Sequence, residues 1–135
     1  MNRYRILLVS HAYVTPINRQ KASALAASGD VEVTLLIPAR WDAPVPGLER
    51  DEPYRLIKLP VSFPGRGGAH FYLKGLSKLV KEFRPHIIHL EEEPWAVSAF
   101  QFSQMKRMHR FRLILFSWEN LVKSFHGIRG WMEAM

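Results

Sequence analysis

Residues 84–101 read RPHIIHLEEEPWAVSAFQ, a strand pattern that runs into a helix pattern. The apolar run Ile87–Leu90 has the length of a buried β-strand, and the carboxylates Glu91–Glu93 follow it directly. Pro94 comes next, and proline suits the first turn of a helix because the N–H that it lacks would have no partner there. The segment therefore predicts a strand, a charged turn, and a helix that begins near Pro94.

The acidic turn Glu91–Glu93 has two interpretations that the sequence leaves open. Ligands of open α/β sheets bind beyond the carboxyl ends of the strands, which is where these side chains would lie. Carboxylates at that place also stabilise the positive end of the following helix dipole without taking part in any chemistry. Because side chains alternate along extended backbone, the middle residue, Glu92, is expected to point away from its two neighbours.

Strand and helix patterns alternate along the rest of the chain. Strands are predicted at 5–10, 31–38, 54–59, 87–90 and 111–116. Helices are predicted at 17–28, 70–83 and 94–109, with loops rich in proline and glycine at 39–53 and 60–68. This order is typical of the α/β class and predicts a Rossmann-like three-layer sandwich with a mostly parallel sheet.

Composition narrows the class of protein. The 135 residues suit one domain, and a hydrophobic content of 47% is enough for a packed core. The absence of cysteine excludes disulfides and zinc-thiolate sites, and together with the lack of any bilayer-length apolar run it favours a cytoplasmic location. The net charge of +7 implies an anionic partner, but the cations form no known nucleic-acid-binding motif, so nucleic acid is not expected.

Two basic features of the sequence each have two possible interpretations. Gly65–Gly68, with Arg66 inside it, could cradle a phosphate or could be a plain loop, since its spacing matches no known phosphate-binding motif. Lys74, Lys78 and Lys81 share the polar face of the helix predicted at 70–83. That face could rest on anionic lipid as a peripheral membrane contact, or it could simply be solvated.

Polar residues that follow the first and last predicted strands are candidate site residues. His11 is placed to act as a general base or a phosphate ligand, or to be a structural histidine. Glu119 and Asn120 follow the last strand as the carboxylates follow the previous one. Trp118 is either a core residue or a platform for a sugar ring. His86 and His89 have no spacing that suggests a metal site, and none is expected.

Three segments together resemble a known family: RILLVSH at 5–11, PHIIHLEEEPW at 85–95 and FSWEN at 116–120. They resemble the N-terminal half of GT-B-fold glycosyltransferases, and in particular the retaining family-four group. That family often has D-hydrophobic-hydrophobic-H-x-H-E-P in the corresponding strand, which His89 and Glu93-Pro94 match with one additional residue between them. The family's glycine pair after the first strand is missing, and Trp118 stands where a histidine is common.

The resemblance implies transfer of a sugar, with retention, from a nucleotide-sugar donor to an unidentified acceptor. It implies no cofactor other than the donor. The expected catalytic residues are Glu119 and His11, because of their places just after the last and first predicted strands. The expected substrate-binding residues are Glu91, Glu93, Trp118, Asn120 and Tyr13.

The resemblance also implies a division of the enzyme. A second domain, not contained in residues 1–135, would hold most of the donor. The chain is then a single acceptor-side domain, cut before its last strand and inactive alone. A sugar-nucleotide epimerase of the same two-domain plan and a non-catalytic Rossmann-like binding module remain alternatives.

Overall fold

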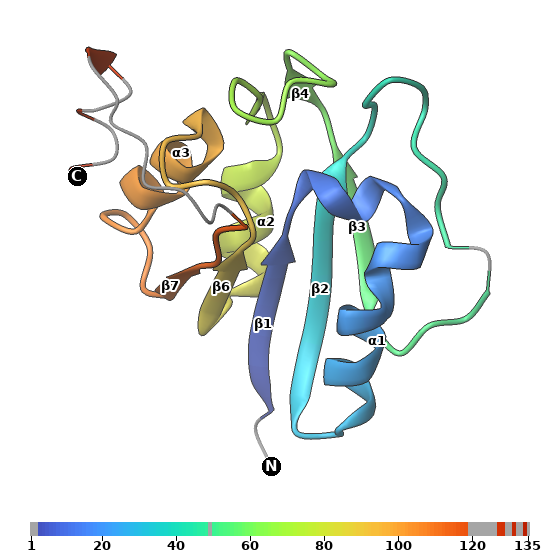
Figure 1. Cartoon of the computed structure of the whole chain (residues 1–135). Coiled ribbons are helices and arrows are strands. Elements are labelled where there is room, and N and C mark those ends of the chain that lie inside the picture. The colour runs from blue at the N-terminus through green and yellow to red at the C-terminus, as the bar shows by residue number, and fades with distance from the viewer. Residues whose placement is uncertain (1–2, 49, 119–126, 129–130, 132–133, 135) are drawn as a thin grey trace.

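A five-stranded parallel sheet forms the centre of the computed structural model, which describes residues 3–48, 50–118, 127–128, 131 and 134 (Figure 1). Its strand order is β3-β2-β1-β6-β7, and all four pairings are parallel. The strands are β1 (Tyr4–Val9), β2 (Val31–Pro38), β3 (Arg55–Leu59), β6 (Ile87–Leu90) and β7 (Arg112–Leu115). The predicted α/β class and parallel sheet are confirmed.

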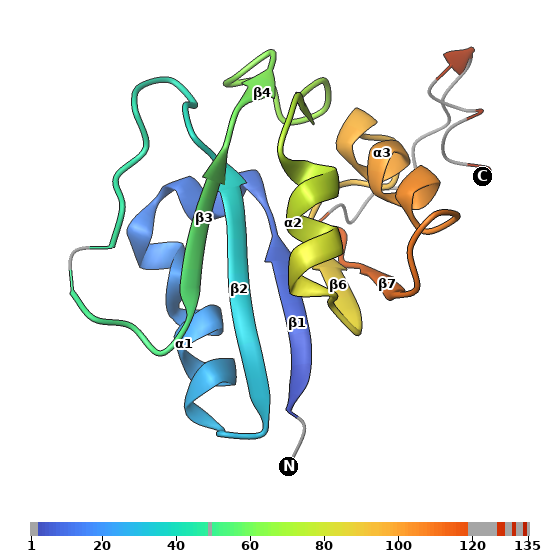
Figure 2. The ribbon, with the colours of Figure 1, turned by 180° about the vertical axis from the view of Figure 1, so that it is seen from behind.

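Helices cover both faces of the sheet. Helix α1 (Gln20–Ala27) packs on one face through a core that includes Leu8, Ala22 and Leu35. Helices α2 (Leu76–Phe83) and α3 (Val97–Met105) lie on the other face, as Figure 2 shows from behind. Each sheet face is apolar because strands of a parallel sheet are buried on both sides. The result is a Rossmann-like three-layer sandwich.

The chain reverses its direction of winding between β1 and β6. From β1 it proceeds outward through β2 to β3, and it then returns to place β6 on the other side of β1. Val9 pairs with Leu90, so both strands end at the same level, and the N–H of Glu91 donates to the carbonyl of Val9 (2.9 Å). Such a reversal is the usual ligand-binding crevice of open α/β sheets.

The prediction of a helix over 70–83 is wrong for its first part. Phe71–Tyr72 forms β5, which pairs antiparallel with β4 (Val61–Ser62) inside the predicted loop. The side-chain amide of Gln101, on α3, binds both backbone groups of Tyr72 (2.8 and 2.9 Å) and holds them extended. Gly75 then turns the chain with φ of 89°, a conformation that favours glycine, and α2 begins at Leu76.

The other two predicted helices are shorter than expected. Pro94 is not in the first turn of α3, which begins at Val97, because Ala96 is extended and its N–H donates to the Glu93 carbonyl (2.9 Å). The segment predicted to open the first helix is a 3-10 turn, η2 (Pro16–Arg19), that precedes α1. Gly29, just past α1, has a left-handed conformation with φ of 81°, which favours glycine.

Burial in the sheet predicts a graded loss of stability on truncation. Ile88 on β6 is fully buried (0% exposed), whereas Ile114 on the neighbouring β7 is 45% exposed. We expect Ile88→Val to lower the free energy of unfolding by about 0.5–1.5 kcal/mol, because it leaves a small cavity. The control Ile114→Val should change it by less than about 0.5 kcal/mol. Urea unfolding followed by circular dichroism measures both, and equal effects would contradict this assignment of the core.

Candidate functional site

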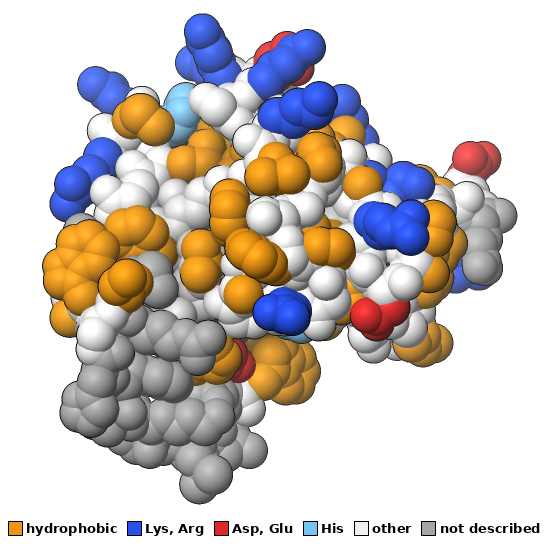
Figure 3. Space-filling view, turned by 90° about the horizontal axis from the view of Figure 1, so that it is seen from above, with side chains coloured by type: hydrophobic (Ala, Val, Ile, Leu, Met, Phe, Trp, Pro, Cys, Tyr) orange, Lys and Arg blue, Asp and Glu red, His pale blue; other side chains and the backbone are white. Residues whose placement is uncertain are grey.

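Two adjacent carboxylates are buried where β1 and β6 end. Glu91 is 5% exposed and Glu92 is 3% exposed, although both follow the last residue of β6. Burial of a carboxylate is costly unless donors surround it, so these side chains must be paired. Figure 3 looks onto this carboxyl edge, where hydrophobic side chains (orange) spread over the middle and Lys and Arg (blue) lie mainly around the rim.

Glu92 binds the turn that follows β1. The backbone N–H of His11, the first residue of the 3-10 turn η1 (His11–Val14), donates to its Oε1 (2.8 Å), and the Nδ1 of His11 lies 2.7 Å from its Oε2. The Nε2 of His70 lies 3.6 Å from Oε1. Burial lowers the pKa of His70, and the charge of Glu92 opposes that shift. The carboxylate thus joins the β1 turn to the residue that precedes β5.

Glu91 has a different set of partners on the same turn and on α1. The hydroxyl of Tyr13 donates to its Oε1 (2.6 Å), and the ammonium group of Lys21 forms an ion pair with the same oxygen. Burial and the hydrogen bond to Glu91 raise the pKa of Tyr13. His89 Nε2 lies 3.8 Å from Glu91, and burial lowers the pKa of this imidazole.

Glu93, the third carboxylate, holds the segment that follows β7. Its Oε1 accepts the backbone N–H of Trp118 (3.0 Å), and its Oε2 accepts the hydroxyl of Ser117. The indole of Trp118 is 67% exposed and meets the ring of Phe116 edge to face, with centroids 5.1 Å apart. Glu93 therefore positions an exposed aromatic side chain at the carboxyl edge.

Aromatic rings and close backbone surround the His11 imidazole. Trp41 stacks on His11 with centroids 5.0 Å apart, and it meets His70 edge to face at the same centroid distance. A Cβ added at Gly67 would lie 3.2 Å from the His11 ring, and one at Gly68 would lie 2.3 Å from Trp95. The glycine loop is thus needed for close packing against aromatic rings. Its use as a phosphate cradle stays a prediction.

A cavity of about 520 Å³ opens beside Glu91. This volume is within the range of small-molecule sites, about 300–1,000 Å³. The Lys21 ammonium group reaches over the ring of Phe116, 5.0 Å from its centroid. Aromatic and polar groups both line the cavity: Ala12, Tyr13, Asn18, Lys21, Glu91, Phe116 and Trp118.

Most of the predicted site residues that the structure describes lie together at this edge. The cavity is lined by Tyr13, Glu91 and Trp118, among others. Glu93 binds the backbone N–H of Trp118, and His11 binds Glu92. Glu119 and Asn120 lie outside the described residues, so their roles stay predictions.

Sequence reasoning missed Asn18 and Phe116 of the cavity lining. It also missed four residues of the surrounding network: Glu92, Lys21, Trp41 and His70. Glu92, which the sequence predicts to point away from Glu91 and Glu93, is the partner of His11. The other three come from distant segments that only the fold brings to the edge.

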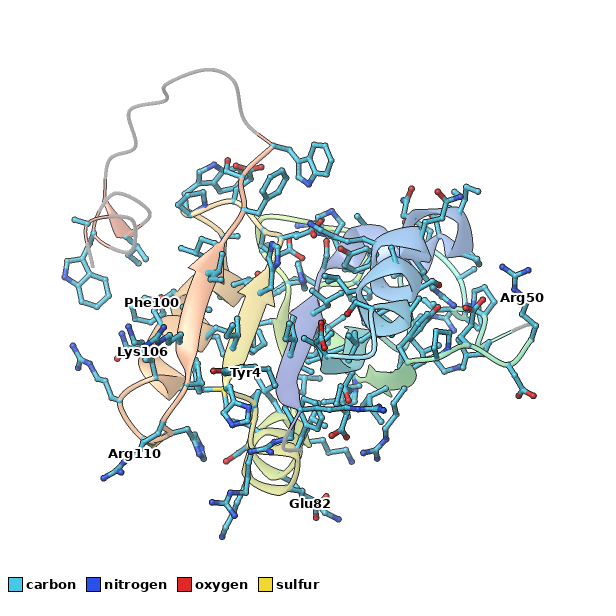
Figure 4. The ribbon with its side chains drawn as sticks, turned by 90° about the horizontal axis from the view of Figure 1, so that it is seen from below. Tyr4, Arg50, Glu82, Phe100, Lys106 and Arg110 are labelled. Carbon is cyan, nitrogen blue, oxygen red and sulfur yellow. The ribbon has the colours of Figure 1, made fainter. Side chains whose placement is uncertain are left out.

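The opposite, amino edge of the sheet carries basic groups and no part of this site. Figure 4 shows it from below, with Tyr4 and Arg110 at the strand starts and Glu82 on α2.

The three lysines of the predicted lipid contact, Lys74, Lys78 and Lys81, are exposed, and Lys78 lies 3.9 Å from Glu82. None of the helices in the described part of the chain combines the length and apolar character that crossing a bilayer requires. Contact of these lysines with anionic lipid stays a prediction.

Comparison of the chain with protein-family models, curated proteins and solved structures finds no match. The function is therefore argued from the site itself and from the sequence motifs.

Two buried tyrosines give a matched test of the carboxylate network. Tyr13 and Tyr72 are each 2% exposed, but only the Tyr13 hydroxyl has a hydrogen-bond partner among the described residues. We expect Tyr13→Phe to lower the free energy of unfolding by about 1.5–3 kcal/mol, because Glu91 loses a donor. Tyr72→Phe should be neutral or stabilising, because it removes an unpaired hydroxyl. Urea titration of the two variants compares them, and equal losses would show that the Tyr13–Glu91 bond contributes nothing.

Proposed function

We propose that this chain is the acceptor-side domain of a glycosyltransferase and that the cavity beside Glu91 binds a saccharide portion of the acceptor. Two independent observations support the proposal. The sequence segments at 5–11, 85–95 and 116–120 resemble one family of such enzymes. In the Rossmann-like fold, the ends of the first two segments and residues 116–118 of the third lie around one edge of the sheet.

The composition of the cavity is the observation that carries the proposal. Sugar rings present an apolar face that stacks on aromatic side chains and hydroxyl groups that need hydrogen-bond partners. Trp118 and Phe116 offer exposed aromatic surface, and Asn18 offers an amide on the same cavity. One wall can thus take the ring face of a sugar while the others bind its hydroxyl groups.

Lys21 and Glu93 have distinct roles in this proposal. The Lys21 side chain is 40% exposed although it is paired with Glu91, so its remaining N–H groups can donate to a sugar hydroxyl or an acceptor phosphate. Glu93 fixes the backbone of Trp118 and thereby the plane of the platform. Glu119 keeps its predicted catalytic role, in which its carboxylate would bind a sugar hydroxyl or stabilise the positive charge that develops at the reacting carbon.

The platform role of Trp118 predicts a selective loss of saccharide binding. On an array of immobilised oligosaccharides, we expect the wild-type chain to bind and Trp118→Ala to bind about tenfold more weakly, because about 1.4 kcal/mol of stacking is lost. Phe63→Ala is the matched control, since Phe63 is also exposed (52%) but lies outside the cavity-lining residues. Absence of saccharide binding by the wild-type chain, or equal losses in both variants, would contradict the cavity assignment.

Transfer activity is expected only from a protein that also contains a donor-binding domain. The whole open reading frame that encodes this chain should release nucleoside diphosphate from a nucleotide sugar when a cell-lipid and oligosaccharide extract is supplied as acceptor. The isolated 135-residue chain should release none, because under this proposal a separate domain orients the donor.

In that longer protein, Glu119→Gln should lower turnover by roughly a hundredfold or more, because a charge-stabilising group is lost. Its melting temperature should be unchanged. Saccharide binding without any nucleotide release would indicate a binding module instead of a transferase.

A further inference from the structure

His11, His70 and Glu92 form a cluster that the proposed acceptor site does not use. They come from three separate segments: the turn after β1, the residue before β5, and the turn after β6. One ligand-type atom from each lies within 4.8 Å of the other two. Two imidazoles and a carboxylate make up the protein ligand set of several catalytic zinc sites, which keep a further position open for water or substrate.

The hydrogen bonding of His70 leaves one ring nitrogen available. Its Nδ1 lies 2.9 Å from the carbonyl oxygen of Gly67, and because a carbonyl can only accept, Nδ1 carries a proton. Nε2 is buried in a side chain that is 0% exposed and has no hydrogen-bond partner among the described residues. An Nδ1–H bound to a backbone carbonyl is the usual support of an imidazole that binds metal through Nε2.

This free nitrogen lies near a carboxylate oxygen that accepts the backbone N–H of His11. Nε2 of His70 lies 3.6 Å from Oε1 of Glu92, so in the neutral imidazole two lone pairs are directed toward one another. A cation between them would turn that repulsion into two bonds. Two ligands at about 2.1 Å from a tetrahedral zinc ion lie roughly 3.4 Å apart, which is close to the observed spacing.

His11 completes the set from the solvent side. Its Nδ1 is 2.7 Å from Oε2 of Glu92, and its side chain is 36% exposed, whereas those of His70 and Glu92 are 0% and 2% exposed. The cluster is thus closed on the protein side and open at His11. Trp41 stacks on one imidazole and contacts the other edge to face, which restrains both rings.

We propose that His11, His70 and Glu92 bind one divalent transition-metal ion, with zinc as the type ion, and leave a coordination position open toward solvent. The inference goes beyond the acceptor-binding cavity and does not depend on it, because that cavity is lined by other residues. An ion at this position could act as a Lewis acid toward a bound oxygen ligand. The alternative is a purely hydrogen-bonded cluster in which a proton on His70 faces Glu92.

Zinc binding to the purified 135-residue chain tests the proposal without any assay of activity. Metal is first removed with EDTA, and the EDTA is then removed by dialysis. Calorimetric titration with zinc chloride should show that one ion binds per chain, with a dissociation constant of roughly 1 μM or tighter. Zinc should also raise the melting temperature, because it binds the folded state more tightly than the unfolded chain. Titration with cobalt chloride should give visible absorption bands that are typical of a metal ion with a low coordination number.

Substitutions assign the ion to this cluster. His11→Gln and His70→Gln should each weaken zinc binding by about a hundredfold and abolish the thermal shift. His109→Gln, outside the cluster, is the matched control and should bind as the wild type does. Circular dichroism checks folding, and if His70→Gln does not fold, the partly exposed His11 decides the question. Failure of the wild type to bind zinc stoichiometrically, or full binding by His11→Gln, would overturn the proposal.

Discussion

Glu91 and Glu92 are the two charges whose burial organises the carboxyl edge of the sheet. Each would cost several kcal/mol to bury without partners, so the fold must bring donors to them. The donors come from segments that the parallel pairing of β1 and β6 places nearby: the turn after β1 and the N-terminal part of α1. The geometry of the site is thus a consequence of satisfying two adjacent carboxylates.

Alternation along the backbone divides the edge into two parts. Glu91 gathers Tyr13 and Lys21 beside the cavity, whereas Glu92 gathers His11 and faces His70. The first part has the aromatic and polar lining that suits a saccharide. The second has the ligand types and spacing that suit a divalent cation. If both proposals hold, two adjacent residues of one turn support two different kinds of chemistry.

The strands could be predicted from the sequence because their signal is local. The ranges 31–38 and 87–90 match β2 and β6 residue for residue, since each is an apolar run with clear ends. Helix starts were predicted less well, because long-range hydrogen bonds override local preference: the Gln101 amide holds Tyr72 extended, and the carbonyl of Gly68 accepts the N–H of Val97. His70 could not be assigned to the site for the same reason, since its position depends on the β4–β5 hairpin.

Glu92 and His11 should be energetically coupled, because the bond between them joins the β6 and β1 ends. A double-mutant cycle with Glu92→Gln, His11→Gln and the double variant, measured by urea unfolding in EDTA, tests it directly. We expect a coupling free energy of about 1–3 kcal/mol, as for other contacting pairs in one network. Additive losses, with a coupling below about 0.5 kcal/mol, would contradict it.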